Sequence, residues 1–166
     1  MDKIKYKFKI ATDTFDPYRE IEKWQINNQM AAMSIFIGRV REIDQFGSQL
    51  KKLEIHHYSG LTEKLIEKHL SEITKKIASF SALVIHRVGF IDPLEPIVLI
   101  AVSADKRGIA NQYCSEILEV TKFKVPFWKK EWTDKGSSWV KNNTVLSTWT
   151  IKLFFWKAVP KDMFLS

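Results

Sequence analysis

The chain has 166 residues, of which 45% are hydrophobic and 27% are charged, and its formal net charge is +7. This length and composition are typical of one globular domain and exclude a disordered chain. No run approaches the roughly 18–20 apolar residues of a membrane span, and the N-terminus lacks a signal peptide's unbroken apolar stretch. A reduced cytoplasm is the expected location. The positive charge favours an anionic partner, whether a nucleic acid, acidic lipid, phosphorylated metabolite or acidic protein.

The first predicted element is a strand over residues 3–10, where lysines and apolar residues alternate with a period of two. Lysines on one side place it near a sheet edge, where they discourage unwanted pairing. A row of lysines that binds nucleic acid is the weaker alternative. Asp16 and Pro17 then predict the start of a short helix, an N-cap followed by proline, with Ile21 and Trp24 pointing inward.

Two strands are predicted next, over residues 31–40 and 50–58, and a loop separates them. A long amphipathic helix begins at Gly60, because apolar residues recur there at spacings of three and four. We expect either Ser59 or Thr62 to cap this helix.

The second half of the chain predicts strands over residues 82–86 and 97–103, followed by a helix over about 104–123. Pro126 must end that helix, because the residue before a proline is pushed out of helical geometry. The order of elements predicts an α+β domain over residues 1–143, with a mixed or antiparallel sheet and two main amphipathic helices.

Residues 144–166 form a C-terminal extension rich in aromatic side chains. Within it, apolar and polar residues alternate and then give way to Phe154, Phe155 and Trp156. Burial of such side chains is favourable, so we expect residues 148–156 to pack on the domain or on a partner. A disordered tail suits residues 157–166 better.

Cysteine and histidine positions limit the possible chemistry. A single cysteine, Cys114, excludes an internal disulfide, and the four histidines have no partner cysteines for a common zinc motif. We therefore expect neither a metal site nor a cofactor. Cys114 falls on the apolar side of its helix, so any sulfur chemistry would need sulfur delivered from elsewhere. His86 and Arg87 end a strand, and we expect them to bond turn carbonyls rather than to act in catalysis.

Three clusters of basic residues fall at the ends of predicted elements, where binding sites are commonly built. The first is Arg39 and Arg41, at the end of a strand. The second is Lys106 and Arg107, at a helix start whose backbone N–H groups already favour an anion. The third surrounds Pro126 and consists of Lys122, Lys124, Lys129 and Lys130.

Lys122 lies at the edge of the apolar stripe of the second main helix. If it is partly withdrawn from water, its ammonium form is disfavoured and it can act as a base or nucleophile. The alternative is a surface lysine that complements the negative end of the helix dipole. Lys129 has the same two interpretations.

Four segments, FIGRVR (36–41), HHYSGLTEK (56–64), IHRVG (85–89) and VPFWKKE (125–131), occur in one order. In that order and at those intervals they resemble the large-subunit family of molybdopterin synthase. The match covers roughly residues 3–140, and PFWKKE and YSGLTEK are its most specific parts.

This resemblance implies an α/β-hammerhead fold, a homodimer and one small ubiquitin-like partner per protomer, assembled as a heterotetramer. The partner's C-terminal Gly-Gly tail carries a thiocarboxylate. The implied reaction transfers its sulfur to a phosphorylated pterin, cyclic pyranopterin monophosphate, and forms the dithiolene of molybdopterin. Neither a nucleic acid nor a membrane is an implied partner.

The resemblance also assigns site residues. The family's two essential lysines fall on Lys122 and Lys129, its phosphate-contacting arginine on Arg41, and its His-Arg pair on Lys106 and Arg107. The other residues expected to bind substrate lie beside these positions, and they are Phe36, Arg39, Val40, Lys130 and Glu131.

Two departures from the family pattern leave alternatives open. Lys106 stands where the family has histidine, and Asn142 and Asn143 occupy a stretch where a basic residue is expected. One alternative is a degenerate member that keeps the fold and partner surface but not catalysis. The other is a basic RNA-binding module, against which stands the lack of an RRM-type aromatic motif or a GXXG loop.

Overall fold

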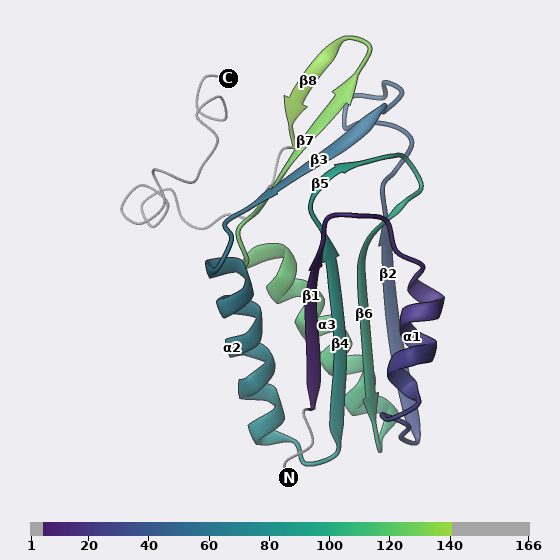
Figure 1. The fold of residues 1–166 in the computed structure, drawn as a ribbon, viewed down its shortest axis with the longest axis vertical. Coiled ribbons are helices and arrows are strands. Elements are labelled where there is room, and N and C mark those ends of the chain that lie inside the picture. The colour runs from purple at the N-terminus through teal and green to yellow at the C-terminus, as the bar shows by residue number, and fades with distance from the viewer. Residues whose placement is uncertain (1–4, 141–166) are drawn as a thin grey trace.

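The computed structural model describes residues 5–140, so the expected tail segment 148–156 lies outside the described residues (Figure 1). Within residues 5–140 the chain forms three helices and eight strands, and the strands make two four-stranded sheets. The predicted α+β class is confirmed. The chain has two sheets rather than one, and the second sheet supplies much of the site.

The first sheet has the strand order β1-β4-β6-β2. Its first strand runs parallel to its neighbour and the other two pairings are antiparallel, so the sheet is mixed as predicted. The edge strand β1 exposes Lys7 and Lys9, in agreement with the expected edge position. The strands of this sheet are β1 (Tyr6–Ala11), β2 (Ala32–Arg39), β4 (Phe80–Arg87) and β6 (Pro96–Ala104).

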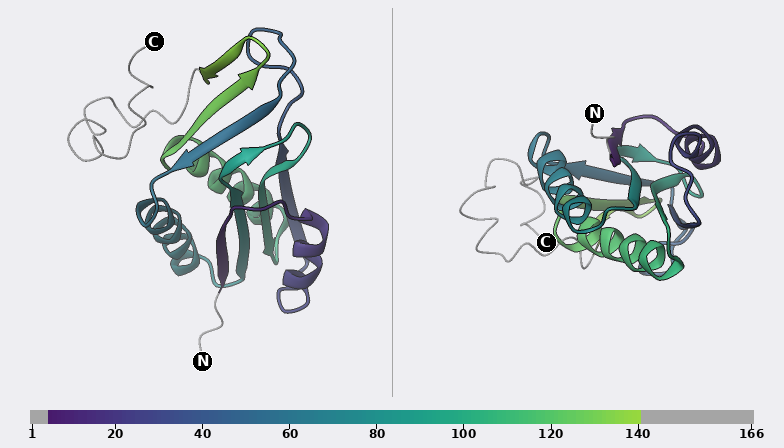
Figure 2. Two further views of the ribbon diagram at one scale, coloured as in Figure 1. Left: turned by 45° about the horizontal axis from the view of Figure 1, so that its top comes forward. Right: turned by 90° about the horizontal axis from the view of Figure 1, so that it is seen from below.

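Helices cover both faces of the first sheet. The long helices α2 (Leu61–Lys76) and α3 (Arg107–Phe123) pack on one face, and α1 (Pro17–Gln25) lies on the other (Figure 2). In β4, Ala82 and Val84 join the core under the long helices, whereas Leu83 and Ile85 pack with α1. Two-sided burial explains why this strand is an almost unbroken apolar run. No helix in the described part of the chain is long and apolar enough to cross a membrane.

The N-caps of α1 and α2 can be compared with those predicted from the sequence. Asp16 caps α1 as predicted, because its Oδ1 accepts hydrogen bonds from the N–H groups of Tyr18 (2.9 Å) and Arg19 (3.3 Å). The predicted side-chain cap of α2 is wrong: its N-cap is Gly60, with φ of 85°. There the Glu63 carboxylate accepts a hydrogen bond from the Gly60 N–H at 2.7 Å. A positive φ explains the glycine, since other residues adopt it only at a cost.

The second sheet is antiparallel throughout and lies beyond one end of the first (Figure 1). The sequence predicted only one of its strands. In order across the sheet, the strands are β5 (Gly89–Ile91), β3 (Lys52–His57), β7 (Phe127–Thr133) and β8 (Gly136–Trp139). Successive side chains of a strand point to opposite faces. Phe127, Lys129 and Glu131 therefore share one face of β7, which is turned toward the first sheet.

Candidate active site

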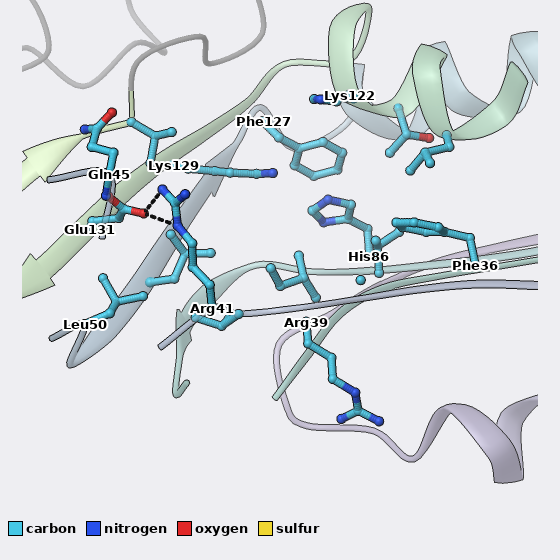
Figure 3. A pocket seen from close by; sticks show the side chains of 18 of the residues that line it. Phe36, Arg39, Arg41, Gln45, Leu50, His86, Lys122, Phe127, Lys129 and Glu131 are labelled. Atoms are coloured by element: carbon cyan, nitrogen blue, oxygen red, sulfur yellow. Dashed lines mark hydrogen bonds and ion pairs between the residues drawn. The ribbon is translucent and has the colours of Figure 1, made fainter. Parts of the chain in front are cut away.

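A cavity of about 790 Å³ lies where the two sheets meet, next to the C-terminal end of α3 (Figure 3). Its walls come from β2 and the segment after it, from β3, β4, β6, α3 and β7, and from Val140 after β8. Segments far apart in sequence thus meet at one place. The charged, titratable and aromatic side chains among the lining residues are Phe36, Arg39, Arg41, His86, Glu119, Lys122, Phe127, Lys129 and Glu131.

Lys129 extends from β7 into this cavity and is partly buried. Burial lowers the pKa of its amine below the ordinary value of 10.5, and the positive charges of Lys122 and Arg41 lower it further. The causes are physical: the ammonium form loses hydration and is repelled by two cations. A larger fraction of Lys129 is therefore a neutral amine, able to accept a proton or attack a carbonyl.

Lys122 projects from the last turn of α3 toward the same cavity. It is exposed, which favours the interpretation of Lys122 as a surface lysine at the end of the helix, and the desolvated lysine is Lys129. The Nζ atom of Lys122 lies 4.9 Å from the centroid of the Phe123 ring. Lys122 thus contributes a hydrated positive charge that reaches the site.

Arg41 is held at the cavity by a buried carboxylate. Its Nε and Nη2 atoms donate to Oε1 of Glu131 at 3.2 and 2.7 Å. Only 2% of the Glu131 side chain is exposed, against 55% for Arg41. The second oxygen of Glu131 accepts a hydrogen bond from the Gln45 N–H at 3.2 Å. Glu131 therefore positions the guanidinium, and the exposed part of Arg41 is available to an anion.

Three more predicted residues, on β2 or directly after it, line the cavity, and their side chains contribute differently to its wall. Phe36 and the fully buried Val40 supply apolar wall. Arg39 lines the rim, but its Nη1 atom donates to the carbonyl of Leu94 at 3.0 Å. Figure 3 shows its guanidinium directed away from Arg41 and the lysines.

Lys130 is predicted to bind substrate but lies on the opposite face of β7. Its Nζ atom sits over the rings of Trp132 and Trp139, 5.4 and 5.2 Å from their centroids. The reason is the two-residue period of a strand, which sends neighbours of Lys129 to the other side. Lys130 therefore does not reach the cavity.

Lys106 and Arg107 are also absent from the cavity lining. Lys106 is the N-cap of α3 and Arg107 is its first residue, whereas Lys122 lies in the last turn. A helix rises 1.5 Å per residue, so Arg107 and Lys122 are separated by about 22 Å along the axis. Within one protomer this predicted pair and the lysines do not share a site.

His86 lines the cavity, which the sequence did not predict. Its ring stacks on Phe127 with centroids 3.8 Å apart and an interplanar angle of 8°. Burial lowers the pKa of His86 to about 3, and the charge of Lys129 contributes to this shift. The expected bond to a backbone carbonyl is confirmed, since Nδ1 lies 2.7 Å from the Arg87 oxygen. A histidine in an otherwise apolar strand was the only signal in the sequence.

Cys114 is buried in the core beneath α3, as predicted, and 5% of it is exposed. Burial raises the pKa of its thiol, so the thiolate needed for nucleophilic attack is disfavoured. Within residues 5–140 no group of three or more His, Cys, Asp or Glu side chains is arranged to hold a metal ion. The positively charged side chains that line the cavity, Arg39, Arg41, Lys122 and Lys129, favour anionic reactants.

The chain is similar in sequence to one protein family and to several of its members. The profile of the MoaE protein family matches residues 10–124. The molybdopterin synthase catalytic subunit of Ralstonia nicotianae is 42% identical over 112 residues, which cover 68% of this chain and 63% of that protein. The protein of the same name from Pseudomonas aeruginosa is 31% identical over 133 residues, covering 80% of this chain and 88% of the relative. The chain thus spans less than two thirds of the Ralstonia protein.

Solved structures agree with the sequence comparisons. The molybdopterin biosynthesis MoaE protein from Burkholderia ambifaria has a TM-score of 0.70 and 32% identity, and the match covers 89% of this chain and 97% of that one. Molybdopterin synthase from Staphylococcus aureus has a TM-score of 0.72 and 30% identity, with coverage of 81% and 96%. A complex of subunits 1 and 2 of the molybdopterin-converting factor from Helicobacter pylori shares the fold at 19% identity and a TM-score of 0.70, with coverage of 82% and 92%.

Proposed function

The chain belongs to the MoaE protein family, and we propose on this basis that it is the catalytic subunit of a molybdopterin synthase. Its reaction transfers sulfur from the thiocarboxylated C-terminus of a small ubiquitin-like protein to cyclic pyranopterin monophosphate, forming the molybdopterin dithiolene. The observation that carries the proposal is the convergence of Lys122, Lys129 and Arg41 on one cavity. Both reactants are anionic, and fixed cations in a partly dry site stabilise such groups.

The two lysines take different parts in this proposal. Lys129 acts as proton acceptor or nucleophile, because its lowered pKa makes the neutral amine more available. Lys122 remains an exposed cation and stabilises negative charge that develops on the thiocarboxylate oxygen. Arg41, oriented by Glu131, binds the phosphate of the pterin.

The proposed assembly is a homodimer that binds one small subunit per protomer. The Helicobacter pylori relative is described as a complex of two subunits, which supports a two-subunit enzyme here. Lys106 and Arg107 then reach a substrate phosphate only if they come from the second protomer, because within one protomer they lie at the far end of α3. The cytoplasm is the proposed location, and no nucleic acid or membrane takes part.

The test is reconstitution with purified components. We expect the chain, mixed with thiocarboxylated small subunit and cyclic pyranopterin monophosphate, to yield the dithiolene product, measured by mass spectrometry. The same small subunit with an ordinary C-terminal carboxylate is the matched control and should give no product.

Two other outcomes have distinct meanings. Binding of both reactants without product would identify a degenerate member of the family. Binding of RNA oligonucleotides, without binding of either reactant, would identify the basic RNA-binding module and overturn the proposal.

A further inference from the structure

The imidazole of His86 is fixed in the wall of the cavity by three features. Its Nδ1 atom lies 2.7 Å from the Arg87 carbonyl oxygen. One face stacks on Phe127 at 3.8 Å. Only 4% of the residue is exposed, although it lines the cavity. A side chain held in this way presents one defined edge to whatever occupies the space.

The contact with Arg87 determines which tautomer is present. A carbonyl oxygen only accepts hydrogen bonds, so Nδ1 carries the proton and Nε2 keeps its lone pair. Because its pKa is lowered to about 3, the ring is neutral at neutral pH. Such a ring is too weak a base to remove a proton from an ammonium group, but it accepts a hydrogen bond at all working pH values.

The Lys129 ammonium is within electrostatic reach of this ring, since it opposes protonation of His86, and His57 acts in the same direction. Figure 3 shows the Lys129 side chain extending from β7 toward the stacked rings of Phe127 and His86. Further charged or titratable groups surround the two residues: His57 on β3 acts on His86, and the cavity around Lys129 is lined by Arg41 after β2, Glu119 and Lys122 on α3, and Glu131 on β7.

We propose that His86 is a positioning residue for Lys129: its Nε2 atom accepts a hydrogen bond from the Lys129 amine and holds that amine toward the substrate. A neutral acceptor suits this purpose better than a carboxylate. A carboxylate would stabilise the ammonium strongly and keep the lysine protonated, whereas an imidazole orients the group at a smaller cost to the neutral amine. The consequence for turnover rests on the proposed function; the contact itself does not.

Three substitutions of His86 separate the functions of its ring. In His86→Asn the amide takes the place of Nδ1 and keeps a donor for the Arg87 carbonyl, but no atom replaces Nε2. In His86→Gln the longer amide replaces Nε2 and loses the Nδ1 position. His86→Phe keeps the stack on Phe127 and removes both nitrogens. His56→Phe makes the same change on β3 at a residue outside the cavity lining, and is the matched control.

The first measurement is independent of turnover. Each variant is treated with a small acylating reagent across a pH series, and modification of Lys129 is followed by mass spectrometry, with outward-facing Lys130 as internal reference. We expect the midpoint for Lys129 to move to lower pH in His86→Asn and His86→Phe, because the ammonium has lost an acceptor. It should stay near the wild-type value in His86→Gln and His56→Phe.

The second measurement is dithiolene formation. We expect kcat to fall by about tenfold to a hundredfold in His86→Asn and His86→Phe, the range expected when a reacting group is misplaced by about 1 Å. His86→Gln should retain kcat within about threefold of wild type, because one orienting hydrogen bond is kept.

The outcomes are distinguishable. If His86→Phe matches wild type in both measurements, the ring is only packing and the inference is wrong. If His86→Asn is active and His86→Gln is not, the bond to Arg87 is what matters, and the inference is again wrong. If the wild-type chain forms no dithiolene but the Lys129 midpoints shift as expected, the proposed function fails and the contact stands.

Discussion

Lys122 and Lys129 differ in their contact with water, the property on which amine chemistry most depends. Lys129 is partly buried and its pKa is lowered, whereas Lys122 is exposed. If the neutral amine of Lys129 is the reactive form, kcat rises with pH through its lowered pKa and levels off below the range of an ordinary lysine. We expect this rise in a pH profile of dithiolene formation. A profile that keeps rising to the ordinary lysine range, near 10.5, would contradict it.

The same shift carries a cost in stability, which Lys129→Met should remove. Below the lowered pKa, both folded and unfolded chains hold the proton, and the folded state bears the full cost of a buried cation. As pH rises from the lowered pKa to 10.5, that cost disappears, because the unfolded chain binds more protons in this window. We expect Lys129→Met to raise the free energy of unfolding at pH 7, where the cost of the buried ammonium is present. The gain should vanish near pH 11 in denaturant melts, while the variant forms no product.

Lys122→Ala tests the second lysine. We expect product formation to fall below about a tenth of wild type, a barrier increase above ~1.4 kcal/mol, with an unchanged melting temperature. The matched control is Lys124→Ala, an exposed lysine at the C-cap of the same helix that does not line the cavity. Turnover above this level in the Lys122 variant would show that its charge is dispensable.

At the scale of elements, Glu131 joins β7 to the segment that follows β2. It accepts two hydrogen bonds from Arg41 and one from the Gln45 backbone. Glu131→Gln keeps the shape and removes the charge, so we expect the Kd for the phosphorylated pterin to rise about tenfold to a hundredfold, as for loss of one charge-assisted bond of ~1.5–3 kcal/mol. Calorimetric titration measures this change.

A matched control is available on the same sheet. Glu54→Gln makes the same change at a carboxylate that accepts a bond from Trp132 Nε1 at 2.8 Å, away from the cavity. Its pterin affinity should equal that of wild type. If Glu131→Gln and Glu54→Gln bind the pterin with equal affinity, Arg41 does not bind its phosphate.

At the scale of the whole molecule, the separation of Arg107 from Lys129 predicts complementation between protomers. Lys129→Ala and Arg107→Ala should each be inactive alone. After the two are unfolded and refolded together, random pairing in a symmetric dimer gives about a quarter of wild-type activity, because half the dimers are mixed and each has one intact site. No recovery in a mixture shown by native mass spectrometry to contain mixed dimers would exclude a site shared between protomers.

The C-terminal extension is the other question at this scale. We propose that residues 148–156 of the extension 144–166 pack on the domain 1–143 or on a partner, because each large aromatic side chain left in water forgoes roughly 1.5–3 kcal/mol of burial. A chain ending at Asn143 should then melt at lower temperature, be less soluble or dimerise more weakly. If all three properties are unchanged, the extension is not part of the folded assembly.

Local sequence patterns were enough to predict most strands of the first sheet and the helices that cover it. A period of two marked β1, an Asp-Pro pair marked the start of α1, and spacings of three and four marked α2 and α3. These signals survive because each element buries one face against the core, so the pattern in the chain reflects the pattern of burial.

Most of the second sheet, including β7, was not predicted from the sequence, and for β7 the reason is tied to the site. On β7 the face turned toward the cavity carries Lys129 and Glu131 beside Phe127, while the opposite face carries the buried Trp128 together with Lys130 and Trp132. Both faces of this strand therefore mix charged and aromatic residues, and neither is uniformly apolar. A strand that builds a site therefore loses the alternation by which strands are recognised.

The sequence by itself determined the class of fold, the family and the candidate lysines, because these depend on local periodicity and on short motifs. Only the tertiary structure decided which lysine is desolvated, that Glu131 orients Arg41, that His86 lines the cavity and that Arg107 lies too far away. Desolvation, ion pairing and distance depend on neighbours brought together from β2, β4, α3 and β7. The sequence pattern of one segment does not show which residues of a distant segment will contact it in the folded protein.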